Sequence, residues 1–450
     1  MTTHRRQAGT VRLASVAGTA ALLLSGVACS GALDVPNPQA FGDDALNNSI
    51  IIKNVTDGAE GVLMLAYDDM IVMTELLSDD VESTSTWIDW EDISEGRIRH
   101  DWATAGSFSD AQNQLLRARF AAQSAATRVG AVLGAAAQTS PLRAQALLTD
   151  ALADMLMAGA YCEAPLTSNA ARSPDTEVWK QAIAKFTAGL TAAQAIQGDA
   201  TAQAKWTNVA YAGRARANLM AGNYAAAKAD AQNVAAGFQY NAIYAEGAAS
   251  TQSWTGNQFH QNRNRSGGLR RMYHSRVHVI DSTTTGEAYL RDWFDPTKDD
   301  KRMAVTRRAG QLGVNNRFAY FGITKHSDRG APIRMLSKVE ATLIEAEVAY
   351  RSNDYATEAS ILNSLRTRSG VGLPAITTPT SATAARDALL NERQAELWVE
   401  GHRMQDLYRF GVVKDYLGAA RATKLPLSRT EILNNTSMKD GEGTCPSVTQ

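Results

Sequence analysis

Apolar residues recur at helical spacing along most of the chain. Between residues 45 and 77 they fall at every third or fourth position, which predicts one or two helices with an interruption near Gly58 and Gly61. Alanine-rich helical patterns return at residues 107–166, 176–196 and 205–236. Because alanine is the best intrinsic helix former, the pattern predicts a mainly α fold with closely packed helices.

Alanine is absent or scarce in three stretches, which are rich in aromatic, Asn, Gly and Arg residues. These stretches predict loops and short strands laid over the helical frame. The third one also predicts a small antiparallel element. They cover residues 68–102, 251–280 and 286–332.

Two segments read as copies of one helical unit. The first begins at Ala215 and the second at Ala346, and each places small residues on a helix, then a short polar break, then a Tyr (Tyr224 or Tyr355) and a second helix. The unit resembles the tetratricopeptide helix–turn–helix. Two copies are too few for a free-standing solenoid. We therefore predict tetratricopeptide-like pairs in a right-handed helical frame, packed on other helices, with irregular loops and a few short β-strands inserted.

The first residues have the features of an export signal. A basic start at Arg5, Arg6 and Arg12 precedes an apolar run to Leu24 and small residues before Cys29. The run is shorter than the roughly 20 residues of a spanning helix. We predict a signal peptide over residues 1–28 and a tether over residues 29–43.

Composition and charge exclude several classes of protein. The 450 residues include 44% hydrophobic and 20% charged residues, which excludes wholesale disorder. Lys and Arg number 45 against 46 Asp and Glu, so the net charge is -1. This balance gives no field for binding nucleic acid. The length allows two or three sub-domains or one elongated helical array.

The three cysteines fit an exported protein. Gly26-Val27-Ala28-Cys29 resembles a bacterial lipobox, which implies lipidation of Cys29. The alternative is a soluble secreted protein with a free Cys29. Cys162 and Cys445 then remain, and they either form a disulfide or stay reduced and buried.

The most specific motif lies near the C-terminus, in the helical region over residues 385–411. The segment ERQAELWVEGHRMQDLYR, which starts at Glu392, resembles the signature of the RagB/SusD family of nutrient-uptake outer-membrane lipoproteins, with Gln394 in place of a second Arg. The preceding helix pair, the tether from Leu33 to Pro36, and YCEAPL from Tyr161 resemble the family as well. The resemblance is strongest after Met335.

The resemblance implies a cell-surface protein and not an enzyme. Such a protein would be lipid-anchored in the outer membrane, would face the exterior, and would capture a glycan or related oligomer for a SusC-like, TonB-dependent transporter. It implies no cofactor. The domains expected are an N-terminal helical SusD-like region at 44–236 with a loop insert at 68–102, a loop-rich insert with short strands at 237–334, and a C-terminal RagB/SusD helical region at 335–450. A secreted glycoside hydrolase and a repeat-based protein–protein scaffold are the alternatives.

The charged residues of the C-terminal motif are predicted to be structural. Glu392, Glu396 and Glu400 are spaced by four, so they would lie on one helix face. Their carboxylates could serve acid/base chemistry, but an ion-pair lattice with nearby Arg explains them better. Gly401 would permit a close turn. The remaining members of this set are Arg393, Arg403 and Asp406.

Aromatic residues in the alanine-free stretches suggest a ligand site. Trp is costly to expose, so Trp in polar loops needs a reason. Aromatic faces can stack on sugar rings while carboxylates and guanidinium groups bond the hydroxyls. The alternative is that some of these rings belong to the core. The predicted ligand-binding residues are Trp87, Asp89, Trp90, Arg97, Trp102, Trp254, Asn257 and Arg263.

No pattern predicts a metal site. His274 and His278 have no third His or Cys nearby in a helical segment. The acidic residues Asp79, Asp80, Asp295, Asp299 and Asp300 lack the spacing of a calcium loop and are interpreted as solvated turns.

Overall fold

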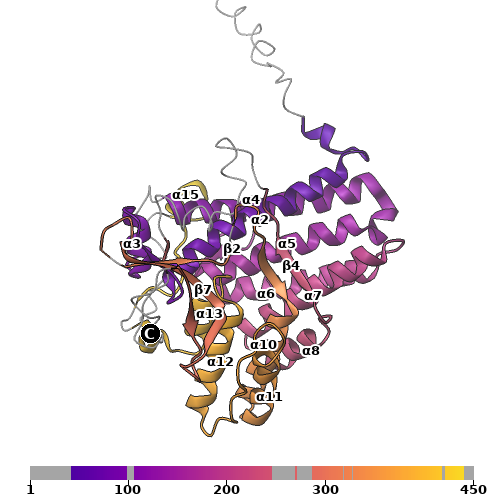
Figure 1. The fold of residues 1–450 in the computed structure, drawn as a ribbon. Coiled ribbons are helices and arrows are strands. Elements are labelled where there is room, and N and C mark those ends of the chain that lie inside the picture. Colours follow the sequence, from indigo (N-terminus) through magenta and orange to yellow (C-terminus); the bar gives the residue numbers. More distant parts are fainter. Residues whose placement is uncertain are drawn as a thin grey trace, which may run out of the picture. The chain divides into compact units, whose positions relative to one another are not determined.

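The computed structural model describes residues 42–98, 106–245, 269–270, 286–317, 319–326, 328–417 and 421–439. The chain divides into two compact units, Met1–Asn47 and Asn48–Gln450. The described part of the first unit contains a short 3-10 helix, η1 (Asp43–Leu46). The fold described below is that of the second unit (Figure 1).

A series of helices forms the N-terminal half of the second unit, and each helix contacts the next along the chain (Figure 1). Two of them begin with side-chain caps, because Ser140 accepts from the Leu142 N–H and Asp199 from the Ala202 N–H. The series comprises α2 (Ile52–Leu77), α4 (Gly106–Leu133), η2 (Gly134–Thr139), α5 (Pro141–Ala160), α6 (Asp175–Gln194), α7 (Ala200–Met220) and α8 (Tyr224–Gln232).

Helix α2 corrects two predictions. It is continuous through Gly58 and Gly61, where an added Cβ would meet nothing within 4 Å, so these glycines do not interrupt it. It also extends to Leu77, so the predicted loop insert at 68–102 begins with ten helical residues. Alanine is missing there because larger apolar side chains such as Met70 and Leu76 fill the buried positions.

Both predicted helix pairs are present. The first is α7–α8, and the second is α10 (Lys338–Arg351) followed by α11 (Tyr355–Arg366). Tyr224 and Tyr355 are the first residues of the second helices, as the repeat predicts. Helix α10 contacts both α7 and α8, so the two pairs pack on each other. The prediction of a mainly α fold with tetratricopeptide-like pairs is confirmed.

Shorter helices complete the C-terminal part. Helix α12 (Ala382–Glu396) packs on α10 and α11, and α13 (Arg403–Arg409) contacts α12 and α2. The helical region predicted over residues 385–411 is therefore broken after Glu396. Val399 and Gly401 have φ of 50° and 79°, which a right-handed helix does not allow. Helices α14 (Val413–Leu417) and α15 (Arg429–Asn434) follow.

The strands form small antiparallel sheets on the helical frame. The three-stranded sheet β6–β7–β8 confirms the antiparallel element predicted within residues 286–332. The pairs are β1 (Glu82–Ser83) with β5 (Leu269–Arg270), β2 (Glu163–Pro165) with β3 (Arg172–Pro174), and β4 (Gln239–Ala242) with β9 (Ile333–Ser337); the larger sheet holds β6 (Gly286–Arg291), β7 (Asp299–Leu312) and β8 (Ala319–Ile323).

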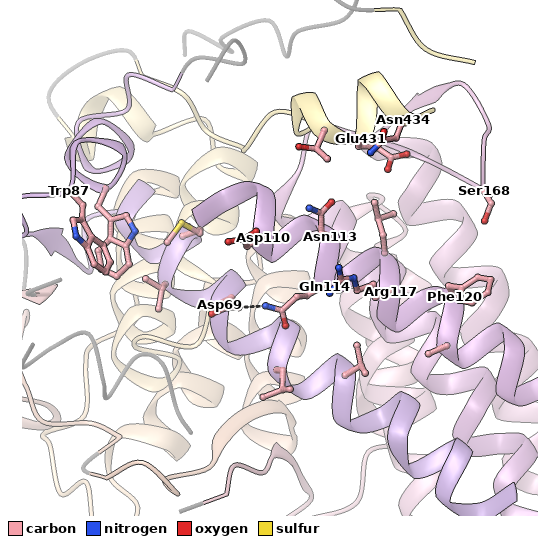
Figure 2. Close-up of a pocket in the computed structure, with 18 residues that line it drawn as sticks. Asp69, Trp87, Asp110, Asn113, Gln114, Arg117, Phe120, Ser168, Glu431 and Asn434 are labelled. Atoms are coloured by element: carbon pink, nitrogen blue, oxygen red, sulfur yellow. Dashed lines mark hydrogen bonds between the residues drawn. The ribbon is translucent and has the colours of Figure 1, made fainter. Parts of the chain in front are cut away.

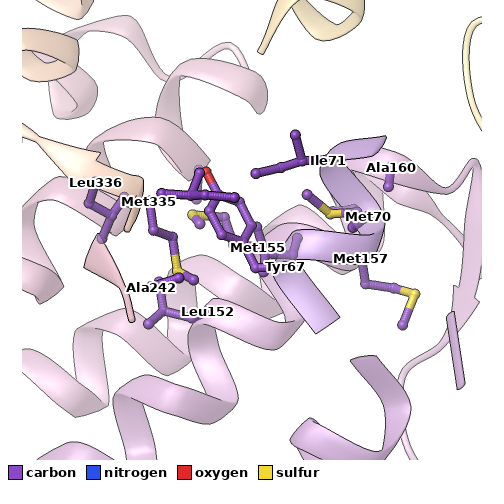
Figure 3. Close-up of a cluster of buried hydrophobic side chains, with 14 of the residues drawn as sticks. Tyr67, Met70, Ile71, Leu152, Met155, Met157, Ala160, Ala242, Met335 and Leu336 are labelled. Atoms are coloured by element: carbon purple, nitrogen blue, oxygen red, sulfur yellow. The ribbon is translucent and has the colours of Figure 1, made fainter. Parts of the chain in front are cut away.

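The main core joins α2 and α5 to the strands β4 and β9 (Figure 3). Tyr67 of α2 is buried in it, and its hydroxyl donates to the carbonyls of Arg334 and Glu400 at 2.9 and 3.1 Å. One residue of α2 thereby ties the N-terminal helices to the C-terminal region. In the part of the chain that the structure describes, no helix is long and apolar enough to cross a membrane.

Candidate functional site

A groove of about 1260 Å³ opens between α2, α4 and α15, with α3 (Ile88–Ser94) near one end (Figure 2). Apolar side chains of α2, such as Val62 and Leu65, line part of it. Polar side chains from α4 and α15 and several aromatic rings line much of the rest. The groove therefore offers both apolar contact and hydrogen-bonding groups, as ligand sites in proteins generally do.

A polar stripe on α4 forms much of this surface. Asp110, Asn113, Gln114 and Arg117 have the i, i+3, i+4, i+7 spacing that places side chains on one helix face, and all four line the groove. Another face of the helix is apolar and fully buried, with Ala111, Leu115, Ala118 and Ala122. Packing of this apolar face fixes the direction in which the polar stripe points.

Aromatic rings lie toward the two ends of the groove (Figure 2). Phe120 of α4 is 67% exposed and Trp87 is 42% exposed, although large apolar side chains are usually buried. Trp90 is buried, at 3% exposure, and meets Trp87 edge to face with ring centroids 4.9 Å apart. Trp90 thus supports Trp87, whose ring remains accessible.

A series of serine contacts positions Trp87. The Ser83 N–H donates to the hydroxyl of Ser94 at 2.8 Å, and the Ser85 N–H donates to the hydroxyl of Ser83 at 3.2 Å. The Trp87 N–H in turn donates to the hydroxyl of Ser85 at 2.8 Å. Such local side-chain to backbone bonds stabilise turns. The polar segment before Trp87 therefore holds the indole on a fixed backbone.

One carboxyl group in the groove has a perturbed pKa. Burial raises the pKa of Asp69 to about 6, and the nearby Asp110 adds to this, while a hydrogen bond from Gln114 at 2.5 Å acts in the opposite direction. The group is therefore mostly ionised at neutral pH and becomes protonated in mild acid. It can then accept a hydrogen bond or donate one.

The other wall of the groove comes from distant parts of the sequence. The Ser428 N–H donates to the side-chain oxygen of Gln112 at 2.6 Å, and the Ser428 hydroxyl caps α15. Asn435 donates to the carbonyl of Ala170 at 3.0 Å, and Arg119 donates to that of Pro165 at 2.7 Å. These bonds hold α15 and the loop after β2 against α4.

A second cavity of about 210 Å³ adjoins the groove. It shares Phe120, Glu431 and Asn434 with the groove and adds Asn169, a residue with φ of 58°. Asn tolerates this left-handed conformation better than most residues. The accessible surface therefore continues beyond Phe120, toward a region rich in amide groups.

The structure brings only part of the predicted ligand site together. Trp87 and Trp90 line the groove, whereas Asp89 and Arg97 do not, and Arg97 forms an ion pair with Asp92 at 2.7 Å. Cys29 lies outside the described residues, as do four predicted ligand-binding residues: Trp102, Trp254, Asn257 and Arg263.

Sequence reasoning missed most of the groove. The sequence pattern of α4 could have indicated part of it. A helix face that bears Asp, Asn, Gln and Arg next to a Phe is unusual for a face exposed only to solvent. The contributions of the loop and of α15 have no such local signal. The missed residues are Asp69, Asp110, Asn113, Gln114, Arg117, Phe120, Ser168, Glu431 and Asn434.

The three glutamates of the C-terminal motif lie in ion pairs with cations from other elements. Glu392 bonds to Arg302 at 2.5 Å and to Arg366 at 3.1 Å. Glu396 bonds to Arg302 and Arg368 at 2.7 and 2.6 Å. These carboxylates are nearly inaccessible to solvent and already paired, so they are poorly placed for chemistry on a ligand.

Glu400 departs from the prediction, because it lies beyond the end of α12 and does not share a helix face with Glu392 and Glu396. It bonds to Lys325 and Arg334 at 2.7 and 2.9 Å. Burial acts to raise its pKa, but these two cations hold the pKa below its usual value. Gly401 adopts the predicted close turn, with its N–H donating to Glu75 at 2.5 Å.

The remaining charged residues of the motif are also paired. Arg393 donates to Asp406 at 2.7 Å, and Arg403 donates to Asp79 at 2.6 Å. The arginines near the glutamates in sequence thus bind other carboxylates, on α13 and after α2. The motif connects elements that are far apart in the chain.

No metal centre is found in the described part of the chain, where no three His, Cys, Asp or Glu side chains are grouped to hold an ion. Three of the acidic residues interpreted from the sequence as solvated turns are instead buried and paired: Asp79 bonds Arg403, Asp80 accepts from Gln394 at 2.6 Å, and Asp300 bonds Arg302. His274 and His278 lie outside the described residues.

Cys162 is disulfide-bonded. The alternative of a reduced, buried Cys162 is therefore wrong. The other two cysteines of the sequence, Cys29 and Cys445, lie outside the described residues. A disulfide accords with export to an oxidising compartment.

The fold defines a class of protein: a helical scaffold built on tetratricopeptide-like pairs, with small sheets and an open groove. Residues 240–444 match the family model of the SusD family. The resemblance to the RagB/SusD family is thus confirmed over these residues, and solved structures of SusD superfamily proteins share the fold. No curated protein matches the sequence.

Solved structures agree with this fold over most of the chain. A SusD superfamily protein from Bacteroides thetaiotaomicron aligns with a TM-score of 0.62 and 16% identity, covering 87% of this chain and 98% of that one. A SusD-like carbohydrate binding protein from Bacteroides vulgatus gives 0.56 and 18%, covering 80% and 83%. A laminarin binding SusD-like protein gives 0.54 and 16%, covering 86% and 99%. At these identities the likeness is one of fold.

Proposed function

We propose that the chain binds a glycan in the groove between α2, α4 and α15. The observation that supports this most directly is the pair of accessible rings, Trp87 and Phe120, on either side of a polar stripe. Sugar rings present apolar C–H faces to aromatic side chains and hydroxyls to amides and carboxylates. The groove offers both kinds of contact.

The dimensions of the groove favour an oligomer over a single sugar. The α4 residues that line the two cavities run from Asp110 to Gln123, which corresponds to about 20 Å of helix at 1.5 Å per residue. The main groove alone exceeds the roughly 300–1,000 Å³ typical of sites for drug-sized ligands. A glycan chain could follow α4 past Phe120.

Two relatives in fold support this proposal, since one is described as carbohydrate binding and another as laminarin binding. A binding role without catalysis also fits the SusD-like fold. As the first test, native electrophoresis of the purified protein in gels containing laminarin, starch, xylan or mannan should show retardation by at least one polysaccharide. Trp87→Ala and Phe120→Ala should each weaken binding by about 1 to 3 kcal/mol, as hot-spot residues do.

A matched control separates loss of contact from loss of folding. Ile243 is also an exposed large apolar residue, at 61%, and does not line the groove. Ile243→Ala should therefore leave the retardation unchanged. If neither groove variant alters binding while both keep the circular dichroism spectrum of the wild type, the site lies elsewhere.

We also propose that the protein acts at the cell surface, anchored in the outer membrane through lipid on Cys29, and delivers its glycan to a SusC-like, TonB-dependent transporter. The lipobox-like sequence before Cys29 and the SusD-like fold support this. Membrane fractionation should release Cys29→Ser but not the wild type. Affinity purification from native membranes should recover a β-barrel transporter, and repeated failure to do so would leave a stand-alone binding protein.

Glycoside hydrolysis is the second candidate function. One observation favours it: Asp69 and Asp110 are two of the carboxyl groups that line the groove, and the pKa of Asp69 is raised to about 6, as in a general acid. The hydrogen bond from Gln114 to Asp69 argues for a binding role instead. Release of reducing sugar by the wild type, abolished in Asp69→Asn, would establish hydrolysis.

A further inference from the structure

The charges that line the groove are unequal. Among its described lining residues, three carboxylates, Asp69, Asp110 and Glu431, accompany a single cation, Arg117. Asp110 and Arg117 are both exposed, and neither has a hydrogen-bond or ion-pair partner among the described residues. They lie seven residues apart on α4, about 10 Å along the helix, so they do not form an ion pair with each other.

Charges on the neighbouring elements are compensated. Near the Trp87 end, Glu91 pairs with Arg317, and Asp92 pairs with Arg97 at 2.7 Å. In the adjoining cavity, Arg119 is bound to Asp154 at 3.4 Å. Among the described residues, the uncompensated charge of this region is therefore negative and lies in the groove itself, where a ligand would be bound.

A ligand in this groove would lose part of its hydration and meet this charge at short range. The interaction of two unit charges 4 Å apart corresponds to roughly a fivefold change in affinity in water and to a larger change near a protein surface. A carboxylate or sulfate group on a sugar would be repelled by Asp110 and by the ionised form of Asp69. A protonated amine would be attracted by the same groups.

We propose that the groove selects glycans without acid groups, and that it binds an amino-bearing glycan more tightly than the N-acetylated form of the same chain. This inference rests on the glycan-binding function proposed above, because it assigns the chemical class of ligand to the same site. Asp110 is the residue best placed to distinguish the two, since its carboxylate is exposed and has no described partner.

The experiment compares polysaccharides by charge. Wild-type protein is tested by affinity electrophoresis against neutral chains (laminarin, starch, xylan, mannan) and acidic chains (polygalacturonate, alginate, chondroitin sulfate). Calorimetry then compares chitosan oligosaccharides with N-acetylated chito-oligosaccharides of equal length. We expect retardation by at least one neutral chain, none by the acidic chains, and tighter binding of the amino-bearing oligosaccharide.

Two variants of opposite charge provide the matched pair. Measured as the ratio of affinities for the amino-bearing and N-acetylated oligosaccharides, the preference should fall roughly fivefold in Asp110→Asn and rise by a similar factor in Arg117→Gln. These side chains have no described partners, so neither change should affect folding.

The outcomes distinguish the two proposals. Retardation by an acidic chain that equals or exceeds retardation by every neutral chain would overturn the inference and leave the glycan-binding function standing. Equal affinity for the amino-bearing and N-acetylated chains, or an Asp110→Asn effect no different from that of Arg117→Gln, would also overturn it. Binding to none of the chains would count against the proposed function itself.

Discussion

Glu358 on α11 is a buried carboxyl group with no bonding partner. Its residue is 0% exposed, and neither carboxyl oxygen has a hydrogen-bond partner in the described structure. Leu362 and Leu365, four and seven residues further on, share its helix face and belong to the buried cluster between α10, α11 and α12. Burial raises the pKa of Glu358 to about 8. The group should therefore reduce stability at neutral pH.

The sign and size of the effect follow from linkage between protonation and folding. The folded pKa of about 8 lies above the ordinary value of 4.5, so the stabilising contribution is complete below pH 4.5 and is lost as the pH rises through 8. Each pKa unit of difference between the folded and unfolded chain corresponds to about 1.36 kcal/mol of unfolding free energy. The unfolding free energy should therefore fall by about 3 to 4 kcal/mol between pH 5 and pH 8. Local relaxation would reduce this to about 2 to 4 kcal/mol.

Glu358→Gln keeps the shape of the side chain and removes its titration. The variant should match the wild type closely at pH 5 and be about 2 to 4 kcal/mol more stable at pH 8. Urea unfolding followed by circular dichroism at both pH values, with the disulfide intact, measures the difference. Parallel loss of stability in the two proteins between pH 5 and pH 8 would refute the reasoning.

Glu347 on α10 supplies the matched control. It is also 0% exposed, but it bonds to Arg409 at 2.6 Å and to Arg351 at 3.1 Å, and its pKa is lowered. Burial alone would raise this pKa, and Arg409 outweighs it. Glu347→Gln should therefore destabilise the protein at pH 8, by about 1 to 3 kcal/mol. Two equally buried glutamates thus give opposite effects.

Three further predictions concern the frame. Glu396→Gln breaks bonds to Arg302 and Arg368 and should lower the unfolding free energy by about 1 to 3 kcal/mol without changing glycan affinity in the folded protein, as melting and calorimetry can check. Gly213→Ala would place a Cβ against the ring of Phe186 and should cost about 1 to 3 kcal/mol in urea unfolding. Burial lowers the pKa of His326 to about 4, so the stabilising contribution of the neutral imidazole is complete above pH 6.5. About 3 kcal/mol of unfolding free energy should be lost as the pH falls to 4. Asn tolerates the left-handed backbone at this position, and acid titration of His326→Asn should not show this loss.

Helix periodicity was sufficient to predict the frame, but not all of its boundaries. Apolar spacing identified the helices and both tetratricopeptide-like pairs, because their buried faces repeat every three to four residues. It did not detect the break between Glu396 and Arg403, since Val399 and Gly401 interrupt the helix through backbone conformation and not through polarity. Apolar spacing correctly predicted helix up to Leu77, whereas the lack of alanine from residue 68 wrongly predicted a loop there, because absence of alanine is not absence of helix.

The site was predicted less completely, for a different physical reason. Trp87 was identified because an indole in a polar segment is unusual. The same argument cannot tell an accessible ring from its buried neighbour, and Trp90 is the buried one. The groove itself arises where α15 packs on α4, through a bond between Ser428 and Gln112 that joins residues 316 positions apart. No local pattern reports such a contact.

That long-range bond has a consequence for the order in which the protein becomes functional. During synthesis, α2 and α4 can pack and expose Trp87 and Phe120 before α15 emerges. The wall that bears Glu431 and Asn434 is made after α2 and α4, so the groove has only part of its lining until α15 has packed on α4. Chains cut before Ser428 would retain these helices but lack that wall of the groove.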